Sequence, residues 1–448
     1  MPTFKYMKIV FCLLALLMSG QLMAQVHEFE LDNGLKILVR EDHRAPVVVA
    51  QIWYKVGSSY EHNGITGVSH VLEHMMFKGT SKHGPGEFSK VIAANGGREN
   101  AFTARDYTAY FQQLEKSRLP ISFEMEADRM RHLTLPEEEF AKEVKVVMEE
   151  RRMRTEDDPR SLTYEKFIAT AFTSNPYHNP IIGWMNDLKN LEVEDLRQWY
   201  RKWYAPNNAT LVVVGDVDPK EVYTLARRYY GGLSRSNMIK PLKPRIEPEQ
   251  QGMRYVSVEA PAKLPYLLMG YKVPVLKTAQ QDWEPYALEV LAGVLDSGAS
   301  ARFSKRLVRD KQVAAGLSVS YNPYAMHEEL FVLGGTPTAS KSIKELQQAI
   351  NEEIVLLKQQ AVTAAELERI KAQVVASKVY EKDSLFYQAM QMGTLETVGL
   401  GWQRMDEYAD KVRAVTAEQI MQVAKKYLIE KSLTVAELKP LSLQQKQK

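Results

Sequence analysis

Cysteine is nearly absent from this sequence, since its 448 residues contain one, Cys12. Cys12 lies in a leader in which Lys5 and Lys8 precede a short apolar run and Ala24 supplies a small residue at the end. This pattern predicts a cleaved signal peptide at 1–24. The mature chain would then have no disulfide, no thiolate ligand and no cysteine nucleophile. Histidine and the carboxylates remain as the available metal ligands.

Long hydrophobic runs and an excess of either charge are also missing. The apolar run of the leader, Ile9 to Met18, has about 10 residues, half of what a spanning helix needs. We therefore expect no stable membrane anchor, and export to the periplasm of a Gram-negative bacterium. Lys and Arg number 58 against 55 Asp and Glu, and this balance gives no reason to expect nucleic acid as a partner.

Several catalytic signatures do not occur. The sequence has no G-x-S-x-G elbow, no Walker A pattern and no G-x-G-x-x-G after a strand. Serine-hydrolase, P-loop and dinucleotide chemistry are therefore not indicated. The chain is long enough for two or more domains with substantial cores.

The most informative stretch present is VSHVLEHMMFKGT at Val68–Thr80. On a helix, His70, Glu73 and His74 project from one face, because residues at i, i+3 and i+4 are neighbours there. Two imidazoles suit zinc, and a carboxylate beside them can take a proton from a metal-activated water. Thr66 is the expected N-cap of this helix.

This motif alone can arise by chance in a chain with nine histidines, so a third ligand is required. The segment 136–155, PEEEFAKEVKVVMEERRMRT, predicts a helix rich in carboxylates. Glu143 and Glu150 are two turns apart and share a face, whereas Glu149 lies about 100° away from it.

Together, HVLEHMMFKGT, GGRENAFTARDYTAY at 96–110 and EVKVVMEE at 143–150 resemble the pitrilysin and insulinase metallopeptidases. The branch with the mitochondrial processing peptidase is the most similar. The resemblance implies one Zn²⁺ per chain, held by His70, His74 and Glu150. It also implies Glu73 as general base, with Glu143 as a second catalytic residue that holds a ligand or a substrate amine.

The rest of the chain is organised as two similar halves. Asp32-Asn33-Gly34 predicts a hairpin near the start, and the proline-rich stretch 233–251 predicts a linker. A slide of about 227 residues sets Ile370 and Ser377 opposite Glu143 and Glu150, and a slide of about 219 sets Glu289, Ala292 and Gly293 opposite the motif. Only the first half can therefore bind zinc.

Hairpins and helices without regular β-α-β alternation predict an α+β fold with largely antiparallel sheets. The expected units are a zinc-binding domain at 25–232, the linker at 233–251, a homologous domain without ligands at 252–440 and a polar tail at 441–448. The resemblance implies that these two α/β-sandwich domains face each other around a chamber.

Substrate contacts are expected in both halves. Asn100 and Ala101 resemble the strand of the family that pairs with an extended peptide or unfolded polypeptide. In the second half Arg309 matches a substrate-binding arginine, but Gly316 stands where the family has a tyrosine, and Tyr321 is the nearest one. The resemblance implies that a zinc-less homologous chain could form a heterodimer and supply the missing groups.

Two other functions remain open at the level of sequence. One is a non-catalytic structural or assembly subunit of the same fold, although such subunits have usually lost ligands that this chain retains. The other is a protein that binds peptides in the chamber without cutting them. Turnover in the presence of zinc separates both from the peptidase.

Overall fold

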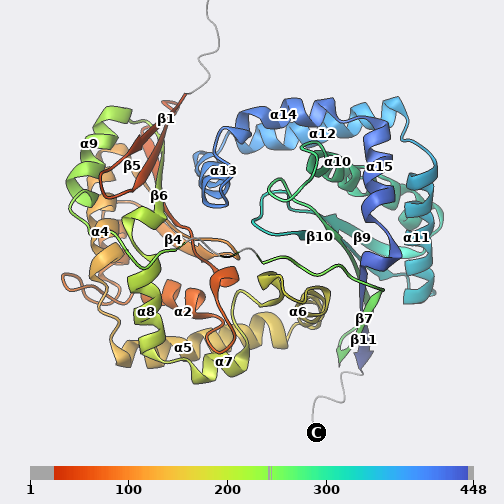
Figure 1. Cartoon of the computed structure of the whole chain (residues 1–448), viewed down its shortest axis with the longest axis horizontal. Helices are drawn as coiled ribbons and strands as arrows, with labels where there is room; N and C mark the ends of the chain where they lie inside the picture. The colour runs from red at the N-terminus through yellow and green to blue at the C-terminus, as the bar shows by residue number, and fades with distance from the viewer. Residues whose placement is uncertain (1–24, 241–242, 244, 442–448) are drawn as a thin grey trace, which may run out of the picture.

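The computed structural model describes residues 25–240, 243 and 245–441. The chain forms two lobes that face each other, each built around one sheet (Figure 1). The predicted signal peptide at 1–24 and nearly all of the tail at 441–448 lie outside the described residues. Within the described part, no helix combines the length and the apolar character needed to cross a membrane.

The first sheet is largely antiparallel and has the strand order β1-β2-β6-β3-β5-β4. Only β2 and β6 run parallel. The predicted hairpin joins β1 and β2, and its Gly34 has φ 85°, a conformation in which glycine avoids the Cβ clash of other residues. The strands are β1 (Val26–Glu30), β2 (Lys36–Glu41), β3 (Val47–Tyr54), β4 (Arg98–Thr103), β5 (Thr108–Glu115) and β6 (Ala209–Gly215).

The second sheet repeats this topology without a counterpart of β1. Its order is β7-β11-β8-β10-β9, and β7 and β11 form its single parallel pair, as β2 and β6 do in the first sheet. The prediction of two related α+β domains is therefore confirmed. The strands are β7 (Arg254–Pro261), β8 (Tyr266–Val273), β9 (Ala314–Ser320), β10 (Glu329–Pro337) and β11 (Leu433–Leu441).

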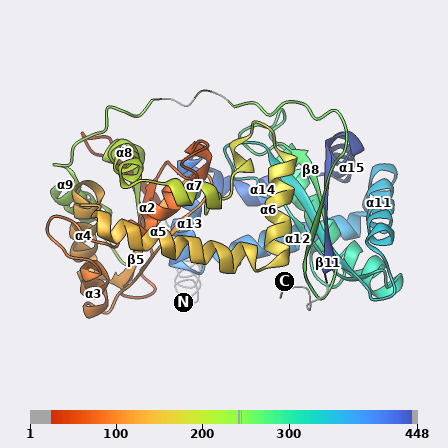
Figure 2. The same ribbon diagram turned by 90° about the horizontal axis from the view of Figure 1, so that it is seen from below.

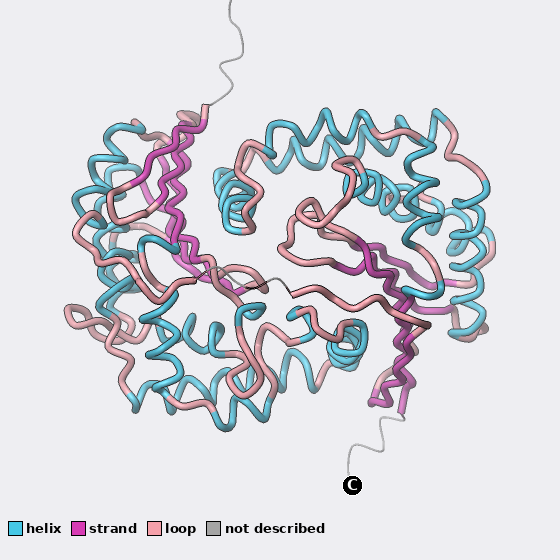
Figure 3. Tube along the Cα trace, in the orientation of Figure 1, coloured by secondary structure: helices cyan, strands magenta, loops and turns pink. Residues whose placement is uncertain are grey.

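Helices cover the outward face of each sheet (Figures 1 and 3). In the first lobe they are α2 (Val68–Met75), α3 (Glu87–Ala94), α4 (Leu119–His132), α5 (Glu137–Arg151), α7 (Met185–Asn190), α8 (Val193–Trp203) and α9 (Pro219–Tyr230). In the second they are α10 (Glu284–Asp296), α11 (Ile343–Gln359), α12 (Ala364–Glu381), α14 (Arg404–Ala414) and α15 (Ala417–Tyr427). Two π-helical segments, Arg152–Glu156 and Phe303–Asp310, follow α5 and precede β9.

The inner face of each sheet is covered by a helix from the opposite half of the chain. Helix α6 (Pro159–Ala171) packs on the second sheet, and α13 (Leu385–Thr397) packs on the first (Figures 1 and 2). Each crossing is close, because Gly393 of α13 lies against Trp53 of β3 and Gly270 of β8 lies against Phe167 of α6. The stretch 233–251 contains no regular helix or strand among its described residues. Because α6 and α13 each pack on the sheet of the other half, the lobes do not correspond to a simple division of the chain at this stretch.

This arrangement explains the unbroken apolar strand VVVAQIWY at β3. Side chains alternate between the two faces of a strand, so Val48, Ala50 and Ile52 enter the outer core, and Val49 and Trp53 enter the core under α13. A strand buried on both faces does not need polar residues at alternate positions.

The similarity between the two halves includes the contact between the helix that carries the motif and the helix that packs on it. In the first lobe His74 of α2 lies beside Glu143 of α5, with 3.2 Å between Nδ1 and Oε2. In the second lobe Gly293 of α10 lies beside Ile370 of α12, so close that a Cβ on Gly293 would come within 2.8 Å of Ile370 Cγ2. The sequence alignment of the halves matched these same pairs. Apolar helix packing in the second lobe takes the place of polar ligands in the first.

Candidate metal and peptidase site

Helix α2 presents one polar face and one apolar face. Val71, Leu72 and Met75 are fully buried in the core of the first lobe. His70, Glu73 and His74 lie on the other face and line a cavity of about 880 Å³ between the lobes. The burial of the apolar face fixes the direction in which the three polar side chains point.

The N-terminus of α2 is held by Glu61, a residue that no sequence motif marks. Its buried carboxylate accepts hydrogen bonds from the backbone N–H groups of Gly67, at 2.7 Å, and Ser69, at 2.9 Å. The prediction of Thr66 as the N-cap is wrong, because its hydroxyl donates to Asp187 Oδ2 at 2.6 Å and α2 begins after Gly67. Glu61 lies outside the three-residue window in which capping boxes are recognised, so no sequence signal identified it.

Helix α5 supplies the third donor opposite α2. Oε2 of Glu150 lies 3.5 Å from His74 Nε2, and Oε1 lies 4.0 Å from His70 Nε2. Tetrahedral ligands about 2.1 Å from a zinc ion are about 3.4 Å apart, so these separations need only small adjustments to hold one. Among the described residues, this is the only group of three or more such side chains close enough to share a metal ion.

The imidazoles of His70 and His74 differ in their hydrogen bonding. Burial lowers the pKa of the His70 imidazole to about 3, and His74 and Arg154 add to this effect, so His70 is neutral and its lone pair is free to bind a metal. Nδ1 of His70 is buried and has no hydrogen-bond partner among the residues that the structure describes. Nδ1 of His74 instead faces Glu143, whose other oxygen lies 2.6 Å from Lys78 Nζ. Glu143 therefore orients the His74 ring, and we assign Glu143 this supporting role.

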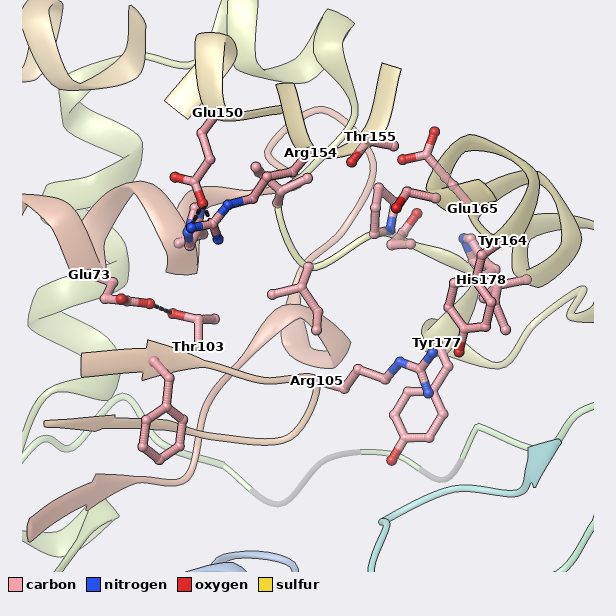
Figure 4. Close-up of a pocket in the computed structure, with 18 of the residues that line it drawn as sticks. Glu73, Thr103, Arg105, Glu150, Arg154, Thr155, Tyr164, Glu165, Tyr177 and His178 are labelled. Atoms are coloured by element: carbon pink, nitrogen blue, oxygen red, sulfur yellow. Dashed lines mark hydrogen bonds and ion pairs between the residues drawn. The ribbon is translucent and has the colours of Figure 1, made fainter. Parts of the chain in front are cut away.

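The side chain of Glu73 is positioned by a neighbouring strand. Thr103 of β4 donates a hydrogen bond from its hydroxyl to Glu73 Oε2 at 2.5 Å (Figure 4). Burial raises the pKa of the Glu73 carboxyl, against the opposing effect of this hydrogen bond. A buried carboxylate with a raised pKa is a stronger base than a solvated one. Thr103 is a second site residue that sequence reasoning missed, because the contact joins two separate elements.

The cavity also exposes a free strand edge. β4 is the outermost strand of the first sheet, and Asn100 and Ala101, for which a substrate contact is predicted, are among the residues that line the cavity. The side chain of Asn100 currently accepts a hydrogen bond from the N–H of Ala101 at 2.9 Å. In the described part of the chain no further strand pairs with β4, and such an edge beside the motif is suited to an extended peptide.

The second lobe contributes differently from the prediction. Arg309 lies exposed in the π-helical segment and is not among the residues that line the cavity. Gly316 is exposed on β9, and Tyr321 donates its hydroxyl to Pro274 O at 2.7 Å. The cavity wall of this lobe is formed instead by Tyr266 and Leu268.

Comparisons with known proteins point to one family. A family model described as "Insulinase (Peptidase family M16)" matches residues 36–184, and one described as "Peptidase M16 inactive domain" matches residues 190–374. The zinc protease PqqE of Helicobacter pylori is 32% identical over 421 residues, 92% of each chain. An uncharacterized zinc protease of Bacillus subtilis, YmxG, is 26% identical over 90% of this chain and 96% of its own.

A solved structure described as a protease from Helicobacter pylori superposes with a TM-score of 0.88 at 30% identity. It covers 93% of this chain, and the whole of that chain is matched. The likeness thus includes both lobes and the helices α6 and α13 that pack between them. With two matched family models, a relative of this similarity and an intact donor set in the first lobe, the chain belongs to the insulinase family of peptidases, family M16.

Proposed function

We propose that this chain is a zinc-dependent endopeptidase that cleaves peptides or unfolded polypeptides. The observation that carries the proposal is the convergence of three metal donors and one buried carboxylate on a cavity wall that ends in a free strand edge. His70, His74 and Glu150 would hold the ion. When bound, zinc supplies a Lewis acid that lowers the pKa of water and polarises a carbonyl.

The side chains of the protein supply the remaining steps. The backbone of β4 at Asn100 and Ala101 would pair with the substrate and set its direction across the cavity. Glu73 would take the proton of the attacking water and later give it to the leaving amine. Thr103 holds the Glu73 carboxylate, and Glu143 holds the His74 ring. Recognition through backbone groups favours unfolded substrates of varied sequence.

The proposed ligand set is tested by metal content. Mature protein purified without chelators should contain about one zinc per chain, since the first lobe offers one donor set. Mutating a residue that only supports a metal ligand typically lowers metal affinity about 10- to 100-fold. His70→Ala or Glu150→Ala removes a ligand itself and should lower zinc affinity by more than about 100-fold. Elemental analysis after dialysis against defined free zinc measures this effect.

His178 provides the matched control for that experiment. It lines the same cavity, but its Nδ1 contacts Asn175 O at 2.9 Å, and it lies outside the donor group. His178→Ala should keep the full zinc content. Two tightly bound ions per chain, or full zinc content in the Glu150→Ala protein, would contradict the assignment.

We also propose that a zinc-less homologous chain acts as a partner. Arg309 is outside the cavity wall and Gly316 has no side chain, so the second lobe lacks the arginine and tyrosine contacts expected of a fully active single chain. Co-expression with a homologue that carries both should raise kcat/KM at least about tenfold, or about 1.4 kcal/mol in the barrier. Equal activity of the isolated chain and the mixture, measured at matched zinc content, would refute the partner.

A further inference from the structure

Two of the arginines that line the cavity are neutralised by direct ion pairs. Arg105 donates to Glu329 of the second lobe at 2.8 Å, and Arg154 lies 2.6 Å from Oε1 of Glu150. Each of these cations is already held by a carboxylate, and Arg154 also acts on a proposed metal ligand. The positive charge of each is therefore already balanced by a carboxylate of the protein.

Arg160, at the start of α6, also lines the cavity and is held by neutral groups. Its guanidinium donates one hydrogen bond to Thr336 Oγ1 at 3.0 Å. Its Cζ lies 4.7 Å from the centroid of the Tyr266 ring. The nearby carboxylate of Asp158 is engaged by the backbone N–H of Arg160 and by the hydroxyl of Ser161. A guanidinium has five N–H donors in a planar fork, so this side chain is oriented while most of its donors remain available.

Tyr164 lies one helical turn further along α6 and also lines the cavity. Residues at i and i+4 are neighbours on a helix, so the phenol and the guanidinium of Arg160 share a face. Tyr164 is 44% exposed, so its ring is accessible from the cavity. Figure 4 shows it on the side of the cavity away from Glu73 and Glu150. An exposed phenol and an exposed arginine, one helical turn apart on α6, thus line the cavity together, and the phenol lies on the side away from the donors.

We propose that Arg160 and Tyr164 bind a carboxylate of the peptide substrate, either an acidic side chain or the C-terminus. The inference rests on the proposed peptidase function and adds a specificity to it. A planar arginine fork matches a carboxylate with two parallel hydrogen bonds, and a phenol hydroxyl can donate a third. Neither residue belongs to the group of metal donors, so the contact would select substrates by charge and hold them in register without taking part in bond cleavage.

Binding to the Glu73→Gln protein tests this inference separately from turnover. Fluorescence anisotropy would compare four versions of one extended peptide, with Glu or Gln at an internal position and with a free or an amidated C-terminus. We expect at least one carboxylate to improve the Kd about tenfold over the neutral peptide, as charge-assisted hydrogen bonds do. The version that gains identifies the source of the carboxylate. Arg160→Gln should remove the gain, and Tyr164→Phe should reduce it.

Arg228 is the matched control. It is an exposed arginine over a tyrosine ring, with Cζ 5.4 Å from the Tyr229 centroid, on helix α9 of the first lobe. Arg228→Gln removes the same charge and should preserve the discrimination between peptides. Equal affinity for all four peptides, or discrimination that survives Arg160→Gln, would overturn the carboxylate site alone. Failure of every peptide to bind would count against the proposed function and this inference together.

Discussion

Glu73→Gln is expected to abolish peptide hydrolysis and to leave the zinc content unchanged. The amide occupies the same volume and can still face Thr103, but it cannot accept a proton from water. General-base catalysis contributes about 10²–10⁴ in rate, so kcat/KM should fall by roughly 10³. A quenched fluorescent peptide measures turnover, and elemental analysis of the same preparation measures zinc.

Glu149→Gln is the matched control for this change. Glu149 is on α5 next to Glu150 but points away from the cavity, with 64% of its side chain exposed, and its substitution should leave kcat/KM unchanged. Thr103→Val should give an intermediate loss of about tenfold, since it removes one hydrogen bond to the base. Substantial turnover by zinc-loaded Glu73→Gln would show that another group is the base. Zinc-loaded wild-type protein that binds peptides without cutting any would support the binding-protein alternative.

The second large effect is expected from Gly393→Leu, which should detach α13 from the first sheet. A Cβ at this position would come closer than 3.0 Å to the indole of Trp53. The ring cannot move aside easily, because it is fully buried and its Nε1 donates to Gln51 Oε1 at 2.9 Å. Overpacking a well-ordered core commonly costs 1–3 kcal/mol, and we expect about 3 kcal/mol or more here. The Tm should fall by roughly 5 °C or more.

Calorimetry and limited proteolysis of α13 would measure this loss. Gly252→Leu is the control, because a Cβ at Gly252 meets no atom within 4 Å, and it should leave the Tm nearly unchanged. Trp53→Ala alone should cost about 3–5 kcal/mol. The double variant should lose less than the sum of the two single losses, since the smaller side chain removes the clash. Additive losses would mean that the two residues do not meet.

Loss of α13 packing should also affect the cavity. Helix α13 joins the second half of the chain to the inner face of the first sheet. The ion pair between Arg105 and Glu329 also connects the two lobes, near the site. A 1 Å displacement of a substrate can cost 10²-fold in rate. The Gly393→Leu protein should therefore lose activity at temperatures where it is still folded.

The sequence by itself determined the features that depend on local periodicity. Helical spacing placed His70, Glu73 and His74 on one face, and the turn residues before Gly34 specified the first hairpin. The distance between Glu143 and Glu150 placed both on the same side of α5, where the structure finds them facing α2. These predictions succeed because backbone geometry fixes the relative direction of side chains within one element.

Only the tertiary structure decided which elements meet. Glu61 reaches the N-terminus of α2 and Thr103 reaches Glu73 across gaps in the sequence that no periodic pattern spans. The crossing of α6 and α13 depends on glycines whose role appears only when another chain segment packs on them. Arg309 is exposed on the π-helical segment and is not among the residues that line the cavity, whereas Arg160 lines it from a helix of the first half that packs on the second sheet. Long-range packing places such groups, because many sequences satisfy the same local rules and the buried contacts between distant segments choose among the possible arrangements.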